Sequence, residues 1–177
     1  FIPKEEMMQV LWGDMDEKSA DRNFKVTLNA LLNALEPKRE ARKPSFFILR
    51  NQKMYRINPN ATIITDRDLF LEHAERGLQT DQNDEALEHL LTSLTYYEES
   101  PFEDMLDVEW LERERRKLES KYILVLEKVA QIYLKQKEYG NVITHAEQIL
   151  KIDPTWEEAY RLLMLAYYRL QNRPQSI

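Results

Sequence analysis

From about Thr65 onward the sequence follows a helical pattern almost without interruption, and it contains an internal repeat. Ala130 and Val142 lie twelve residues apart, and Ala74 and Ala86 have the same spacing in an earlier, weaker copy. Small side chains at this spacing let two antiparallel helices cross closely, and Pro154 ends the clearer copy. This part of the chain is therefore expected to be an all-α stack of helix pairs.

The repeat has the ~34-residue length of a tetratricopeptide repeat. The clearer copy also matches that pattern at four further packing positions, which are Tyr133, Tyr139, Ala146 and Ile149. Another copy starts at Glu157, where Thr155 and Glu158 predict a capping box. A long charged helix is expected over about 109–137, and its buried stripe would contain Leu111, Leu118, Tyr122, Val125, Val129 and Tyr133. Most tyrosines, including Tyr133, Tyr139 and Tyr167, are expected to belong to the core.

The first 62 residues predict two helices. A short helix is expected over 1–13, with Pro3 near its first turn. Ser19 is the expected N-cap of a second helix that ends near Leu35, before Glu36-Pro37. One face of this helix is apolar and should be buried, because of Phe24, Leu28, Leu31 and Leu35. The opposite face presents Arg22, Val26, Asn29 and Asn33, flanked by Lys25 and Ala30.

A basic loop and a β-hairpin follow the second helix. The β-rich runs 46–50 and 54–57 are separated by Asn51, Gln52 and Lys53, so they predict a hairpin. Helix, linker, helix, basic loop and hairpin form the order of the back half of a winged helix-turn-helix domain. The chain is therefore expected to be mainly α: a partial winged helix over 1–62, with two helices and a hairpin wing, then a tetratricopeptide-like domain over 63–177.

Charge is distributed unevenly along the chain. The formal net charge is −6, yet the first sixty residues hold 11 lysines and arginines against 8 aspartates and glutamates. Within 17–60 the corresponding counts are 10 and 4. A local basic excess inside an acidic protein is typical of a nucleic-acid-binding patch, and a solvated basic loop is the equally open alternative.

Composition excludes several other classes of protein. The chain contains no cysteine, so thiolate metal sites and disulfides are absent and a cytoplasmic location is expected. Its three glycines lie too far apart for a phosphate-binding loop, and no apolar stretch approaches the ~18 residues of a membrane span. The acidic run over 98–109 lacks the glycine and spacing of a calcium loop. We expect no enzyme, no cofactor and no metal site; the three histidines, His73, His89 and His145, suit surface or capping roles.

These features together resemble the Streptomyces antibiotic regulatory protein type of transcription factor. The most specific part is the ordered set of Trp12-Gly13, Tyr55-Arg56, Pro101-Phe102 and Trp110 to Glu114. That family joins a winged-helix DNA-binding domain to a bacterial transcriptional activator domain of tetratricopeptide type. The chain begins at the family's second helix and ends one helix short of a third repeat, so it is expected to be a fragment of a longer regulator. It also lacks the family's common arginines at Ala30, Leu32 and Asn33.

The resemblance implies roles for individual side chains on DNA. The helix over about 19–35 would lie in the major groove, where Arg22 would bind guanine, Asn23 or Asn29 adenine, and Val26 a thymine methyl. Phosphate contacts would come from Lys25, Lys38, Arg39, Arg42 and Lys43. The wing, about 46–57, would use Arg50, Lys53 and Arg56. The alternative is that these are the ordinary solvent-facing residues of an amphipathic helix.

The resemblance also implies partners. They are double-stranded DNA, RNA polymerase or another protein at the linker over 14–18, and a partner protein, effector or second copy at the helical repeats. A simple helix connection is the alternative for the linker. A different class of function also stays open, in which the repeats are a protein-interaction module and the winged helix has lost its affinity for DNA.

Overall fold

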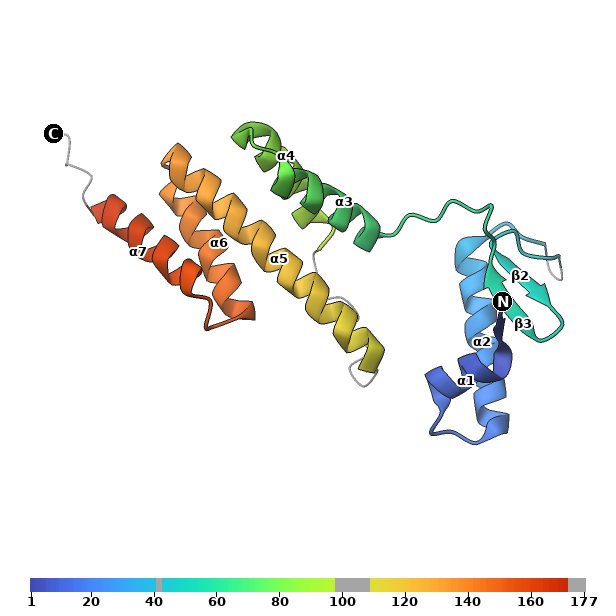
Figure 1. Ribbon diagram of the computed structural model, residues 1–177. Helices are drawn as coiled ribbons and strands as arrows, with labels where there is room; N and C mark the ends of the chain where they lie inside the picture. The colour runs from blue at the N-terminus through green and yellow to red at the C-terminus, as the bar shows by residue number, and fades with distance from the viewer. Residues whose placement is uncertain (41–42, 98–108, 172–177) are drawn as a thin grey trace. The chain divides into compact units, whose positions relative to one another are not determined.

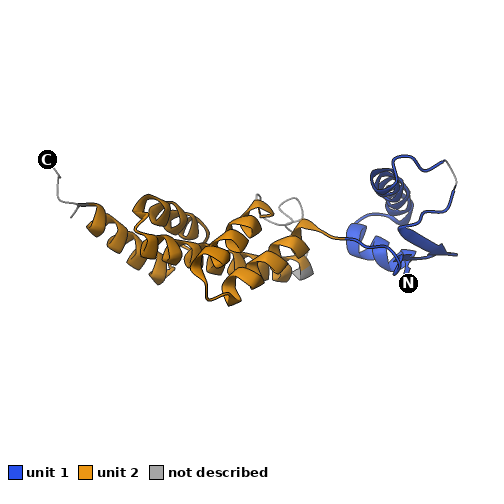
Figure 2. Ribbon diagram, turned by 90° about the horizontal axis from the view of Figure 1, so that it is seen from above, with its two compact units in different colours: residues 1–63 blue, residues 64–177 orange. Residues whose placement is uncertain are grey.

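A computed structural model describes residues 1–40, 43–97 and 109–171 of the chain. The chain consists of two compact units, residues 1–63 and residues 64–177 (Figure 2). The described residues form seven helices and one three-stranded sheet, so the fold is mainly α as predicted. Within these residues no helix is both long and apolar enough to cross a membrane.

The first unit combines a small sheet with two helices (Figure 1). Its elements in chain order are β1 (Ile2–Pro3), α1 (Lys4–Trp12), α2 (Glu17–Leu35), β2 (Ile48–Asn51) and β3 (Met54–Ile57). The strands are antiparallel in the order β1-β3-β2, which confirms the predicted hairpin. Asn51 belongs to β2, however, so the turn consists of Gln52 and Lys53 alone.

Two expectations about the helix starts were wrong. Residues 1–3 are not helical, because Ile2 and Pro3 pair with Tyr55 and Met54 as an edge strand, where the missing N–H of proline is tolerated. The N-cap of α2 is Asp16 and not Ser19. The Asp16 carboxylate accepts 3.1 Å hydrogen bonds from the backbone N–H groups of Lys18 and Ser19, so the helix begins earlier than predicted.

The core of the first unit is small. Its buried hydrophobic side chains among the described residues are Ala20, Phe24 and Tyr55. The rings of Phe24 and Tyr55 meet edge to face with centroids 5.3 Å apart, which joins α2 to β3. Leu31 was expected to be buried but is 44% exposed, because the short strands and α1 do not cover that part of α2.

The second unit is entirely helical. It contains α3 (Asp66–Gln79), α4 (Asn83–Thr95), α5 (Glu109–Gln136), α6 (Tyr139–Ile152) and α7 (Glu157–Gln171). The predicted long helix over 109–137 is confirmed as α5, which lies between the other helices in Figure 1. One side of α5 packs with α3 and α4 through Val125 and Val129. Another side packs with α6 and α7 through Leu126 and Ala130, so α5 joins two hydrophobic cores.

The small residues of the repeat lie where helices meet. Ala74 and Ala86 are buried in the α3–α4 pair, and Ala130 and Val142 are buried in the α5–α6 pair, as their spacing predicted. Two other expectations for this unit, the capping box at Thr155 and the burial of Tyr167, were wrong.

The Thr155–Glu158 capping box does not form. The Thr155 hydroxyl donates to Asp153 Oδ1 at 2.7 Å, while Glu158 accepts hydrogen bonds from Arg161. Tyr167 is 46% exposed, because no described element covers its face of α7, whereas Tyr133 and Tyr139 are half-buried.

Candidate nucleic-acid interface

The outer face of α2 is open to solvent. Since Ala20 and Phe24 are buried, helical spacing turns Arg22, Val26 and Asn29 outward, and all three are exposed. Val26 is 63% exposed although it is apolar. Among the described residues Arg22 has no ion-pair or hydrogen-bond partner. Asn23 differs, because it is half-buried and its Nδ2 donates to the Met15 sulfur at 3.2 Å.

Basic side chains from several elements surround a depression between α2 and the hairpin. We call this the basic depression; it has a volume of about 310 Å³, and its polar lining comes from Lys4, Lys25, Asn29, Arg50 and Lys53. The hairpin register places Arg50 opposite Tyr55, and the guanidinium lies 5.7 Å from that ring. Arg50 Nε also donates to the carbonyl oxygen of Gln52 at 2.8 Å. The fold therefore brings Arg50 and Lys53, two of the three predicted wing cations, next to α2.

Two carboxylates partly neutralise the basic depression. Asp21 lies between Lys4 and Lys25, and its hydrogen bonds to Lys25 and then Lys4 lower the pKa of its carboxyl group to about 2. The Lys53 ammonium lies 3.5 Å from Glu5. Four cations against two carboxylates leave a positive excess, and the side chains of Lys25 and Lys53 are 70% and 78% exposed.

The other predicted phosphate contacts are scattered. Lys38 is exposed, and Lys43 pairs with Glu40 at 2.9 Å. Arg39 is largely buried, because its guanidinium donates to the carbonyl oxygen of Lys43 at 2.7 Å and lies near Glu36. Arg42 lies outside the described residues, as do the acidic residues over 98–107 and Pro101-Phe102.

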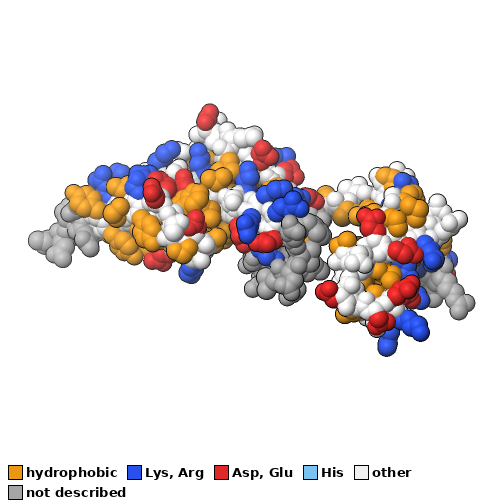
Figure 3. Space-filling model, turned by 60° about the horizontal axis from the view of Figure 1, so that its bottom comes forward, with side chains coloured by type: hydrophobic (Ala, Val, Ile, Leu, Met, Phe, Trp, Pro, Cys, Tyr) orange, Lys and Arg blue, Asp and Glu red, His pale blue; other side chains and the backbone are white. Residues whose placement is uncertain are grey.

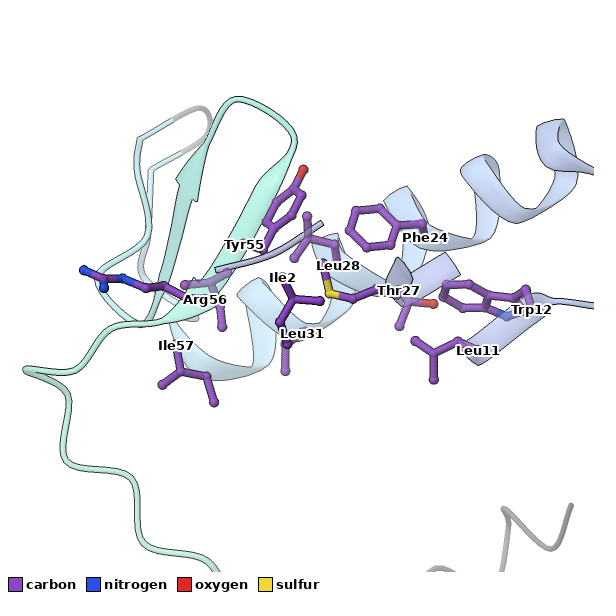
Figure 4. Close-up of a pocket in the computed structure, with 12 residues that line it drawn as sticks. Ile2, Leu11, Trp12, Phe24, Thr27, Leu28, Leu31, Tyr55, Arg56 and Ile57 are labelled. Carbon is purple, nitrogen blue, oxygen red and sulfur yellow. The ribbon is translucent and has the colours of Figure 1, made fainter. Parts of the chain in front are cut away.

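Arg56 lies apart from the basic depression. Its guanidinium lies over the ring of Phe1, 4.4 Å from the ring centroid, and Arg56 is not among the residues that line this depression. Figure 4 shows the Arg56 guanidinium directed away from the Phe24 ring. The three predicted wing cations thus do not lie together.

An apolar groove is the feature of this unit that the sequence did not reveal. It has a volume of about 220 Å³ and lies between α1, α2 and the sheet. Figure 4 shows its side chains converging from these elements, among them Leu11, Trp12, Leu28, Leu31 and Tyr55. The available signal was that Met7 and Leu11 in α1, and Leu28 and Leu31 in α2, are spaced to form one apolar face on each helix. The same spacing is also found where two helices close a core and leave no groove.

The structure thus defines a mainly α protein with two units of different kinds. One unit carries a charged depression beside an exposed helix face, and the other is a stack of helices. The model of the bacterial transcriptional activator domain matches residues 65–177, which contain α3 to α7. The chain belongs to this family, which is one of transcription regulators rather than enzymes. Comparisons with curated proteins and with solved structures find no match.

Proposed function

We propose that this protein is a DNA-binding transcriptional activator. Residues 1–62 would be part of a winged helix and residues 63–177 would be the activator domain, with helix pairs of tetratricopeptide type. The observation that carries the proposal is the basic depression, because it gathers cations from α1, α2 and the hairpin beside a partly unpaired polar helix face. A cytoplasmic location follows from this function.

In the proposed complex α2 enters the major groove. Arg22 is free to bind guanine through two parallel hydrogen bonds, and Asn29 lies at the edge of the basic depression, where it would bind adenine. The exposed methyl groups of Val26 would contact a thymine methyl. Lys25, Arg50 and Lys53 would bind phosphates and so fix the position of α2 without reading sequence.

The apolar groove supports the winged-helix part of the proposal. A complete winged helix has an additional helix that packs on its two other helices and its hairpin. The apolar groove offers a lined surface between those same elements, α1, α2 and the sheet. Covering it would bury the exposed parts of Leu11, Leu31 and Ile57.

The helical unit would serve the regulator in a different way. Stacked helix pairs present an extended surface to partners. We propose that this surface receives a signal, binds a partner such as RNA polymerase, or joins two copies of the chain. Tyr160, Met164, Tyr167 and Tyr168 make one exposed face of α7 apolar. Figure 3 shows apolar side chains on the surface of the molecule.

A second candidate function rests on the same helix. Ala30 and Asn33 are exposed on α2 and carry no charge, so the helix offers few cations to phosphates beyond Lys25. In this alternative the protein is an interaction module that acts through its helical unit alone.

The test is binding of the protein, at its full natural length, to genome fragments at two salt concentrations. Affinity for DNA should fall steeply as salt rises, because phosphate contacts release counterions. Replacing Arg22 and Asn29 together by alanine should relax sequence preference, at ~1–3 kcal/mol of discrimination for each base that is no longer read.

Two pairs of variants that remove the same charge from different places distinguish DNA binding at the basic depression from a general effect of net charge. Lys25→Ala with Lys53→Ala should weaken binding to all sequences and reduce the slope of the salt dependence by about one for each phosphate that is no longer neutralised. The control pair, Lys135→Ala with Lys151→Ala, removes the same charge from exposed positions of the helical unit and should leave DNA binding nearly unchanged. Absence of binding at low salt would contradict the proposal and favour the interaction module.

A further inference from the structure

Two histidines face each other between α3 and α4. His73 and His89 are sixteen residues apart in sequence, yet their Nδ1 atoms lie 3.3 Å apart. Both side chains are half-buried, so they are fixed by their surroundings and remain within reach of solvent. The ring of Tyr96 stacks on His73 with centroids 6.0 Å apart.

The separation of the two imidazoles is held by tight helix packing. His73 precedes the buried Ala74, and His89 precedes the buried Leu90, so each ring is next to a residue of the α3–α4 contact. Gly77 brings the two helices especially close, because a Cβ atom there would lie 2.5 Å from Leu90 Cγ. The two nitrogens are therefore preorganised by the helix pair.

We propose that His73 and His89 bind one transition-metal ion of the Zn²⁺ type through both Nδ1 atoms. Two nitrogens that each lie ~2.0–2.1 Å from one tetrahedral zinc ion are about 3.3–3.4 Å apart, which is the spacing found here. Neutral imidazole is a common ligand for zinc, copper and nickel. The expectation of no metal site rested on spacing within one helix, whereas this pair joins two helices.

The site has two protein ligands, and solvent completes the coordination. No group of three or more histidine, aspartate or glutamate side chains is placed to hold a metal anywhere in the described ranges. Binding is therefore reversible. An ion that bridges α3 and α4 stabilises the first helix pair of the activator domain, because it binds only when the two helices are packed.

The experiment is a calorimetric titration of the full chain with ZnCl₂, using three single variants. We expect the parent chain to bind one Zn²⁺. His73→Gln and His89→Gln should each lower the affinity at least ~10-fold, since loss even of a group that only supports a ligand costs 10–100-fold. His145→Gln is the matched control, because it removes the only other histidine, whose Nδ1 lies 2.7 Å from the carbonyl oxygen of Asn141.

Nuclear magnetic resonance of the parent chain makes the test independent of how the variants fold. Addition of Zn²⁺ should shift the imidazole signals of His73 and His89 and leave those of His145 in place. The proposal is overturned if the parent chain binds no Zn²⁺, if His73→Gln and His89→Gln bind as tightly as the parent, or if His145 responds equally. None of these outcomes affects the proposal on DNA binding, which depends on the other unit.

Discussion

Gly77 sets how closely α3 and α4 approach. Alanine at an open helix position is more favourable than glycine by ~1 kcal/mol. At Gly77, however, the added Cβ would lie 2.5 Å from Leu90 Cγ and 3.0 Å from the Ala86 carbonyl oxygen. Leu90 is fully buried and cannot move aside, so we expect Gly77→Ala to lower the free energy of unfolding by about 1–2 kcal/mol.

Gly140 is the matched control for Gly77. It lies in the first turn of α6, and a Cβ there would meet no atom within 4 Å. Gly140→Ala should therefore raise the free energy of unfolding by up to ~1 kcal/mol. Urea unfolding followed by circular dichroism measures both, and equal effects of the two substitutions would show that α3 and α4 are not tightly packed at Gly77.

Individual residues also show what a sequence pattern omits. Ala74, Ala86, Ala130 and Val142 could be placed in the core because repeat spacing depends only on neighbouring helices. The contact between His73 and His89 could not be found, since it requires the relative rotation of two helices. Ser19 illustrates a different limit: Asp16 and Ser19 both suit an N-cap, and local sequence does not decide between them.

At the scale of elements, α5 ends in a Schellman motif that contains an unusual residue. The N–H of Glu138 donates to the Tyr133 carbonyl oxygen at 2.9 Å, and the N–H of Lys137 donates to that of Leu134 at 3.2 Å. Lys137 has φ of 64°, which favours glycine. Lys137→Gly should raise the free energy of unfolding by ~1 kcal/mol, because it removes the strain of a left-handed non-glycine residue.

A substitution at Lys135 tests whether the expected gain in the free energy of unfolding is specific to position 137. Lys135 lies two residues earlier and inside α5, so Lys135→Gly should lower the free energy of unfolding by ~1 kcal/mol. Thermal unfolding of both variants, with the same loss of charge, gives the comparison. A loss of stability for Lys137→Gly would contradict the assigned helix end.

Long elements were predicted better than short ones. The periodic patterns of α2 and α5 extend over several turns, so their existence and most of their bounds followed from the sequence. The two-residue strand β1 was missed because it forms only by pairing with β3, more than fifty residues later. The basic depression itself was not predicted, although Lys25, Asn29, Arg50 and Lys53, which were proposed separately as DNA contacts, all line it, whereas Arg56 does not.

At the scale of the whole molecule, the two units have very different cores. Among the described residues, three hydrophobic side chains are buried in residues 1–63, and eighteen are buried in residues 64–177. A unit of about 60 residues is marginally stable even with a full core. The first unit also leaves large apolar side chains exposed, including Ile2, Val10, Leu11 and Ile57. We therefore expect the units to open independently, the first at lower free energy.

Hydrogen exchange of the 177-residue chain measures this difference directly. Amides of β2 and β3 should exchange at least ~10²-fold faster than those in the middle of α5, which corresponds to ~3 kcal/mol in opening free energy. Phe24→Ala should remove the remaining protection of residues 1–63 and leave α5 unchanged, since Phe24 joins α2 to β3. Leu126→Ala is the reciprocal change: loss of a fully buried leucine should cost ~2–5 kcal/mol in the helical unit and leave the hairpin unchanged. Simultaneous loss of protection in both units, from either substitution, would show that they unfold as one body and that the basic depression is supported by the helical core.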